Sequence, residues 1–349
     1  MATADFFAYP DDGEDDAWRY YSGSLLDEKG EPPPSLSPLD PLLGAFGRDD
    51  DDESSKRVVT LKAWLGTRGA TTALHYDSQH NAYAQLHGEK IFELYPSEAL
   101  ETSRIQLYPR IHPLSHFSRR GAAMHFGDDT MVDETGASSE AAARPIQRIR
   151  LFAGDVLYIP PFWGHAATCE QSCIAANVWV SSQAMHQNDA VERLPLPFES
   201  HWSAGLKARA AVHFLLRLLQ EASGGVKPCA PVETLLETRW RDADVELFGD
   251  RRYERPTDVS EARRSECRPM TADHDEITPT AIAKLTSYAE TRAHALKAIE
   301  ARVRATLLAD QLERVTHWAT GGVAVATYAL LQRLAECCQA GNEATKDEV

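Results

Sequence analysis

A histidine and an aspartate stand two positions apart in the segment TTALHYDSQHNAY, residues 71–83. On an extended strand His75 and Asp77 would point to the same face, because side chains alternate along a strand with a period of two. Two such side chains can bind one metal ion together. The pair alone is weak evidence for a metal site, so further ligands must come from elsewhere in the chain.

A third candidate ligand, His165, follows the segment GDVLYIPPFWG. A lone histidine is most often a buried residue bonded to the backbone, and that alternative stays open here. Two imidazoles and one carboxylate with open coordination positions form the facial triad of non-haem Fe(II) oxygenases. The same donors would bind Mn(II), Co(II), Ni(II) or Zn(II), so these residues do not name the metal.

A lysine, Lys90, lies just after the first of these segments, in NAYAQLHGEKIFELYP. This pattern predicts a hairpin with a two-residue turn that begins at Gly88. Lys90 would share a strand face with Phe92 and Leu94. It is then either a strand-end lysine whose head reaches water or a lysine that enters a pocket to bind a carboxylate. The segment by itself favours the first interpretation.

The composition narrows the class of protein. The chain has 349 residues, 43% of them hydrophobic, and a formal net charge of −16, which argues against nucleic-acid binding over the whole surface. The six cysteines show neither CxxC nor zinc-ribbon spacing, so we expect reduced thiols. No secretory signal or membrane-spanning stretch is recognised, and we expect a cytoplasmic or nuclear protein that does not enter a membrane.

The order of predicted elements is strands first and helices afterwards, which indicates an α+β protein with a mainly β core. Residues 1–60 form an acidic segment with one strand, in WRYYSGSL, that would join the core. Residues 61–185 contain short strands rich in β-branched and aromatic residues. Residues 187–349 repeat apolar residues at helical spacing.

One long amphipathic helix is predicted over residues 281–319. Thr278 or Thr280 would open it, and Gly321-Gly322 would end it. Its apolar stripe would pack against the β core or against a second copy of the chain. A homodimer through the C-terminal helices is therefore one of the two outcomes that the sequence leaves open.

Taken together, residues 15–183 resemble the JmjC and cupin-8 group of Fe(II)/2-oxoglutarate-dependent oxygenases. The resemblance rests on T-x-x-H-x-D, an asparagine four residues later, G-x-K nine residues after that, and GDVLYIPxxWxH. The small hydroxylase branch is the most similar, and it includes protein asparaginyl and arginyl hydroxylases and a tRNA wybutosine hydroxylase. The resemblance implies a double-stranded β-helix of the jelly-roll or cupin type, followed by helices.

The resemblance also implies a role for each matching residue. The iron ligands would be His75, Asp77 and His165. Lys90, Thr72 and Tyr20 would bind the distal carboxylate of 2-oxoglutarate, with Tyr21 as the alternative to Tyr20. Asn81 and Asn177 would line the cosubstrate site. Trp179 would pack beside the iron. Strand parity does not place Thr72 beside His75, so a bulge or turn between them is required.

The implied activity is hydroxylation of a protein side chain with Fe(II), 2-oxoglutarate and O2. The alternatives are a tRNA-nucleoside hydroxylase, a histone or protein lysine demethylase, a non-catalytic cupin used for interaction, and a zinc or manganese cupin. Residues 102–127 hold four arginines and no acidic residue (Arg104, Arg110, Arg119 and Arg120). This insert is either a solvated loop or a rim near the iron that selects an acidic peptide or a tRNA phosphate.

Overall fold

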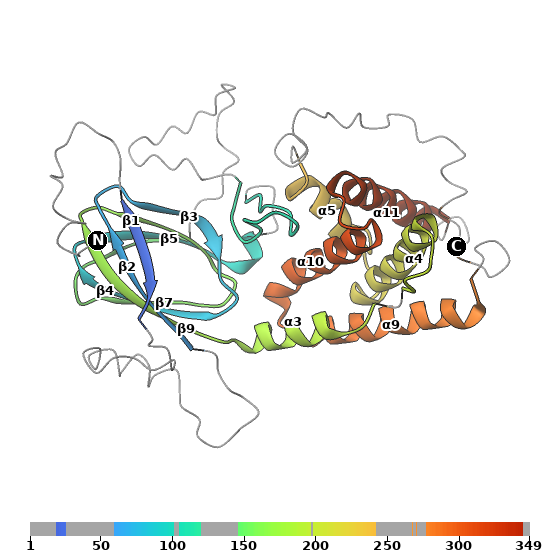
Figure 1. The fold of residues 1–349 in the computed structure, drawn as a ribbon, viewed down its shortest axis with the longest axis horizontal. Helices are drawn as coiled ribbons and strands as arrows, with labels where there is room; N and C mark the ends of the chain where they lie inside the picture. The colour runs from blue at the N-terminus through green and yellow to red at the C-terminus, as the bar shows by residue number, and fades with distance from the viewer. Residues whose placement is uncertain are drawn as a thin grey trace, which may run out of the picture. The chain divides into compact units, whose positions relative to one another are not determined.

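The chain forms two compact units. The computed structural model describes residues 19–25, 59–100, 105–119, 146–196, 198–241, 267, 270 and 277–344. The barrel unit comprises residues 1–99 and 121–186, and the helical unit comprises residues 100–120 and 187–349. The strands belong to the first unit and all helices from α4 onward to the second (Figure 1).

The barrel unit consists of two antiparallel sheets. One has the strand order β1-β2-β9-β4-β7 and the other β3-β8-β5-β6. The strands are β1 (Tyr20–Ser24), β2 (Val59–Gly66), β3 (Thr71–Tyr76), β4 (His80–His87), β5 (Lys90–Tyr95), β6 (Gln147–Leu151), β7 (Val156–Ile159), β8 (Gly164–Cys169) and β9 (Cys173–Val180). The chain alternates between the sheets from β3 to β5 and from β6 to β9. This is the predicted double-stranded β-helix, and the fold class is confirmed.

The predicted hairpin of residues 81–96 is wrong. β4 pairs with β7 and β9, whereas β5 pairs with β6 and β8, so the tight connection carries the chain from one sheet to the other. Gly88 makes this crossing with a φ of 71°. A side chain there would collide with the carbonyl oxygen of Ser172. The sequence signal for the turn was correct, but turn chemistry does not say which sheet the next strand joins.

The core of the barrel lies between the sheets and draws on both. Tyr83 and Leu157 come from one sheet, and Phe92, Leu94 and Ala167 from the other. Because side chains alternate along each strand, every second residue faces this interior. A register shift between Thr72 and His75 interrupts the pairing of β3 with β8, which is the bulge that the sequence required.

The helical unit contains the later helices. They are α3 (Gln183–Arg193), which begins in the barrel unit, α4 (Ala204–Ala222), α5 (Ala230–Thr238), α9 (Pro279–Lys297), α10 (Ala301–Ala319) and α11 (Ala324–Ala344). The 3-10 turn Ser97–Ala99 precedes the insert. Among the described residues, no helix is both long enough and apolar enough to cross a bilayer.

The single helix predicted over residues 281–319 is two helices. Thr278 opens α9 as expected, and its hydroxyl accepts from the amide of Ala281 at 3.2 Å. The chain then turns after Lys297 and buries Ile299, which is 1% exposed. Both resulting helices pack against α4. This turn contains neither glycine nor proline, and apolar residues keep their helical spacing through it. The sequence therefore gives no signal that the helix ends there.

A buried ion-pair network holds the helical unit together. Arg239, 1% exposed, donates to Asp310 at 2.6 Å and to Glu313 at 2.7 Å. The indole of Trp240 donates to Glu313 at 2.6 Å. Burial raises the pKa of Glu313 to about 7, although Arg239 acts in the opposite direction.

The insert is part of this network, because two of its four arginines bind groups of the helical unit. Arg110 donates to Glu192 at 2.5 Å and to Asp310 at 3.3 Å, and Arg119 donates to the carbonyls of Thr238 and Arg241. These two arginines bind the insert to the helices. Arg104 and Arg120 lie outside the described residues.

The cysteines differ from the expectation of reduced thiols. All six form disulfides: Cys169–Cys173, Cys229–Cys338 and Cys267–Cys337. The first joins β8 to β9, and the second joins the start of α5 to α11. Tertiary folding brings together cysteines 70 and 109 positions apart, so no local spacing could reveal these pairs.

Candidate metal and cosubstrate site

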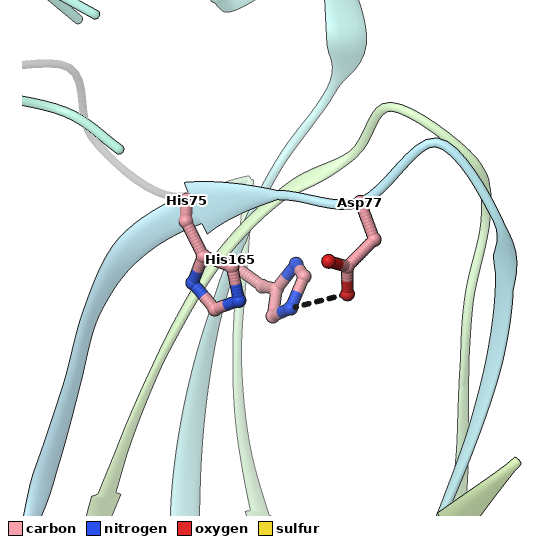
Figure 2. A group of neighbouring side chains, drawn as sticks. All are labelled: His75, Asp77 and His165. Atoms are coloured by element: carbon pink, nitrogen blue, oxygen red, sulfur yellow. Dashed lines mark ion pairs between the residues drawn. The ribbon is translucent and has the colours of Figure 1, made fainter. Parts of the chain in front are cut away.

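The three predicted metal ligands meet in the barrel. His75 of β3 and His165 of β8 are cross-strand partners, and Asp77 follows β3 directly. One ligating atom of each residue lies within 4.8 Å of the others, and Nε2 of His165 is 3.6 Å from Oδ2 of Asp77. Figure 2 shows the three side chains converging from the two strands. This arrangement places two nitrogens and one oxygen close enough together to bind one metal ion.

Backbone carbonyls fix both imidazoles. Nδ1 of His75 lies 2.8 Å from the carbonyl oxygen of Ala73, and Nδ1 of His165 lies 3.0 Å from that of Trp163. A carbonyl only accepts, so each Nδ1 carries the proton and each Nε2 presents a lone pair. Burial, and next His75, lower the pKa of His165 to about 4. The imidazole is therefore neutral at neutral pH, as a metal ligand must be.

The segment before His165 is anchored to the segment that carries Asp77. Phe162 has a φ of 61°, a conformation that costs energy for a bulky residue. Its amide donates to the carbonyl of Asp77 at 2.7 Å, and its ring lies 5.6 Å from that of Tyr76. The strained residue thus couples the two ligand-bearing segments.

Lys90 is buried and has no acidic partner among the residues that the structure describes. It is 2% exposed, and Nζ donates to the hydroxyl of Tyr83 at 2.9 Å. Its ammonium also lies over the ring of Tyr20 at 5.8 Å. None of the described carboxylates forms an ion pair with it, and burial lowers its pKa to about 8. A buried cation with no counter-ion is costly unless a ligand supplies one.

Two hydroxyls accompany Lys90 in the barrel. The hydroxyls of Tyr20 and Thr72 lie 3.0 Å apart, and burial raises the pKa of Tyr20. Tyr21 is 55% exposed, so Tyr20 is the residue of this pair that faces the interior. The register shift in β3 is what allows Thr72 and His75 to face the same interior of the barrel.

A chain of amides and indoles lies on the other sheet. Asn177 donates to Asn81 at 3.1 Å and accepts from the indole of Trp64 at 2.6 Å. Trp179 donates to Oδ2 of Asp77 at 2.9 Å. The structure therefore brings each pair of predicted residues into contact. A metal-bound carboxylate usually has such a donor, which fixes its orientation.

The sequence analysis missed three interior residues. Tyr83 shares the strand face of Asn81, and Trp64 lies on the neighbouring strand β2. Lys62, also on β2, places Nζ 5.3 Å from the ring of Trp179 and 5.9 Å from that of Trp64, with no ion-pair partner among the described residues. Period two from Asn81 would have found Tyr83. Trp64 and Lys62 required the pairing of β2 with β9.

Comparisons with known proteins agree with this arrangement. The chain is 33% identical to JmjC domain-containing protein D of Dictyostelium discoideum over 36% of this chain and 26% of that protein. It is 32% identical to lysine-specific demethylase JMJ30 of Arabidopsis thaliana over 36% of this chain and 27% of that one. It is 28% identical to human bifunctional peptidase and (3S)-lysyl hydroxylase JMJD7, over 42% of this chain and 49% of that protein.

These alignments span about a quarter to a half of the relatives' own lengths. The family model described as a Cupin-like domain matches residues 9–186, which is half of this chain. The matched range contains both sheets and every residue of the candidate site. The chain therefore belongs to the family of cupin-like domains of the JmjC type.

Proposed function

We propose that this protein is an Fe(II)- and 2-oxoglutarate-dependent oxygenase that hydroxylates a protein side chain. The observation that carries the proposal is Lys90, a buried cation without a described carboxylate partner, in the same barrel as the His–Asp–His cluster. A metal cluster alone would fit many cupins. A cationic pocket beside it fits a metal-chelating acid with a second, distal carboxylate.

His75, Asp77 and His165 would hold the iron. With Fe(II) bound, 2-oxoglutarate and O2 are converted to succinate and CO2 while one oxygen atom enters a C–H bond of the substrate. The chain supplies positioning and exclusion of water for this reaction rather than an acid–base pair. Trp179 holds the carboxylate of Asp77 in one orientation, and the two backbone carbonyls hold the imidazoles.

Lys90 and the hydroxyl of Tyr83 would bind the distal carboxylate of 2-oxoglutarate. The ion pair would form in a pocket shielded from water, where it stabilises far more than an exposed pair does. The hydroxyls of Tyr20 and Thr72 are further donors of the same cavity. Asn81 and Asn177 would line its other side.

A protein substrate is favoured over RNA by two observations. The net charge of −16 opposes binding to phosphates. Two of the relatives carry names that specify lysine as their target, one as a lysyl hydroxylase and one as a lysine-specific demethylase. Hydroxylation and demethylation both begin with the oxidation of a C–H bond. In demethylation the oxidised carbon belongs to an N-methyl group and is then lost from the side chain.

Succinate formation from isotope-labelled 2-oxoglutarate, in the presence of Fe(II), tests the core of the proposal. We expect turnover in the native chain and its loss in His75→Ala and Asp77→Ala. His87→Ala, an exposed histidine at the end of β4, is the matched control and should keep full activity. Turnover in either ligand variant at the native rate would refute the metal assignment.

The substrate class is tested by mass spectrometry of treated cell extracts. A mass gain of one oxygen atom is sought on peptides and, in parallel, on tRNA nucleosides, with His165→Ala as the blank. A gain on peptides supports the proposal. A gain confined to nucleosides would replace the protein substrate with tRNA, and a lysine that loses a methyl group would indicate a demethylase.

A further inference from the structure

A cavity of about 530 Å³ lies in the helical unit, next to the turn that joins α10 to α11. Arg110, Arg314, His317 and Trp318 line it, with Gly321 and Gly322 of the turn. Pockets that hold small ligands span about 300–1,000 Å³, so this cavity is large enough for a side chain and its neighbours. None of the described lining residues is acidic.

Three arginines of the helical unit have acidic partners. Arg110, Arg239 and Arg292 interact with three carboxylates, those of Glu192, Asp310 and Glu313. Arg110 and Arg239 bind these carboxylates directly. Arg292 interacts with Glu192 and donates to the carbonyls of Val191 and Leu194.

Arg314, the second arginine that lines the first cavity, differs from these three because no acidic partner is found for it among the described residues. It forms no hydrogen bond or ion pair with any described residue, and its Nη1 is buried. It lies close enough to Arg292 for their like charges to repel each other. An unpaired cation beside another cation is unfavourable in the empty protein, and an anion bound in the cavity would offset that cost.

Trp318 forms a rigid wall between this cavity and a second one of about 560 Å³. Trp318 is 39% exposed. Its ring nevertheless stacks on that of Phe198, with 4.7 Å between the ring centroids, and Nζ of Lys207 lies 5.7 Å from the centroid of the Trp318 ring. Exposed tryptophans that are held in one position are typical anchors of protein interfaces. The indole can therefore bind a ligand without first losing side-chain entropy.

The second cavity supplies an apolar floor. Ala208, Ala326 and Leu330 line it, and its charged lining residues are the basic Lys207 and Arg333. Arg333 is partly neutralised by Glu336 at 3.3 Å. Gly321 and Trp318 line both cavities, so the two cavities are neighbours.

We propose that these two cavities bind an acidic peptide segment. A carboxylate side chain of the peptide enters the first cavity and binds Arg314 and His317, while an adjacent aliphatic side chain packs across Trp318 into the second. His317 is oriented for this role, since Nδ1 lies 3.3 Å from the hydroxyl of Thr327 and Nε2 remains for the ligand. The proposal concerns the helical unit and does not depend on the oxygenase activity.

Binding is measured by fluorescence anisotropy on the full chain, without iron or 2-oxoglutarate. The probe is a fluorescein-labelled synthetic peptide in which glutamate alternates with leucine. The matched peptide has glutamine in place of glutamate. We expect binding of the glutamate peptide alone, and a weaker affinity at high salt. Failure of the native chain to bind the glutamate peptide, or equal binding of the glutamine peptide, would overturn the proposal.

Arg314→Gln should raise the dissociation constant at least about tenfold, which corresponds to about 1.4 kcal/mol. Arg314→Lys keeps the charge and should stay within a few-fold of the native value. Arg68→Gln removes an equal charge from an exposed turn of the barrel unit and should have no effect. An equal loss of binding in Arg314→Gln and Arg68→Gln would show a general charge effect and contradict the site.

Thermal unfolding separates this binding role from a structural one. Arg314 has no described partner and repels Arg292, so Arg314→Gln should unfold at the native temperature or slightly above it. Weaker binding together with unchanged or higher stability is the signature of a ligand site. A clearly lower melting temperature would assign Arg314 to the packing of α10 and defeat the proposal.

Discussion

The indole nitrogen of Trp179 donates a hydrogen bond of 2.9 Å to Oδ2 of Asp77, and this same oxygen lies 3.6 Å from Nε2 of His165. Removing that donor should loosen the metal site. Trp179→Phe keeps a ring beside Trp64 but should weaken Fe(II) affinity about 10- to 100-fold, the range usual for partners of metal ligands.

Anaerobic metal titration measures this change. Trp163→Phe is the control, because the indole nitrogen of Trp163 is buried without a described partner while its backbone carbonyl, which binds His165, is retained. An unchanged affinity in Trp179→Phe would show that the hydrogen bond has no part in holding the metal.

Cosubstrate binding should depend on pH through Lys90. Burial lowers the pKa of Lys90 to about 8, so the empty pocket holds an ammonium below pH 8 and a neutral amine above it. The ammonium is the form that pairs with a carboxylate, and the dissociation constant of 2-oxoglutarate should therefore rise above pH 8, by up to about tenfold per pH unit.

Calorimetric titration of 2-oxoglutarate across this pH range provides the measurement. In Lys90→Arg, where binding survives, the rise should disappear because a guanidinium stays charged at every accessible pH. A dissociation constant that does not change with pH in the native chain would mean that Lys90 does not bind the carboxylate of 2-oxoglutarate.

Tyr83→Phe should weaken 2-oxoglutarate binding without affecting the metal. The variant removes the hydroxyl that we propose binds the distal carboxylate together with Lys90, and it leaves the ring in the core. A hydrogen bond to a charged group is worth about 1.5–3 kcal/mol, so the Michaelis constant for 2-oxoglutarate should rise about 10- to 100-fold. An equal loss of Fe(II) affinity would indicate a disturbed barrel instead.

Arg239→Met should destabilise the helical unit strongly. It would leave Asp310 and Glu313 buried without their main partner, and breaking a buried ion pair in this way costs about 3–5 kcal/mol. Urea unfolding, followed in the transition of the helical unit, measures the loss. Arg217→Met, which removes exposed ion pairs of α4, should cost less than about 1 kcal/mol.

The disulfides predict that the purified, non-reduced protein contains no thiol that can be alkylated. Mass spectrometry after alkylation checks the count. Reduction should lower the melting temperature of the helical unit, because a bond that closes a loop of about 100 residues contributes up to about 4–5 kcal/mol through the unfolded state. Six alkylated cysteines without reductant would restore the original expectation.

The pairing of His75 with Asp77 could be anticipated because the two residues stand two positions apart in one short segment, where strand parity limits their directions. The burial of Lys90 could not, because its segment alone favoured a head that reaches water, and only the resemblance implied a pocket. The bulge beside Thr72 could be inferred as a requirement from the same parity. Asn81 and Asn177 were assigned by resemblance, and the structure places them in contact.

Features that depend on distant segments could not be predicted in this way. Three such features depend on which strands or helices become neighbours. They are the sheet that β5 joins, the position of Lys62 in the barrel, and the disulfides. The turn after Lys297 has no glycine or proline to reveal it. Dimerisation through the C-terminal helices stays a prediction.

The insert, whose Arg110 binds two carboxylates of α10, makes the chain pass between the two units more than once. It leaves the barrel unit after residue 99, returns at residue 121, and departs again after residue 186. The two units are thus joined by three covalent links, not one. A protease cut near residue 190 would yield two fragments still held by non-covalent pairing of the insert, and a gene truncated there would expose Arg110 and Arg119 without their acceptors. Neither unit could be exchanged between proteins by a single recombination event.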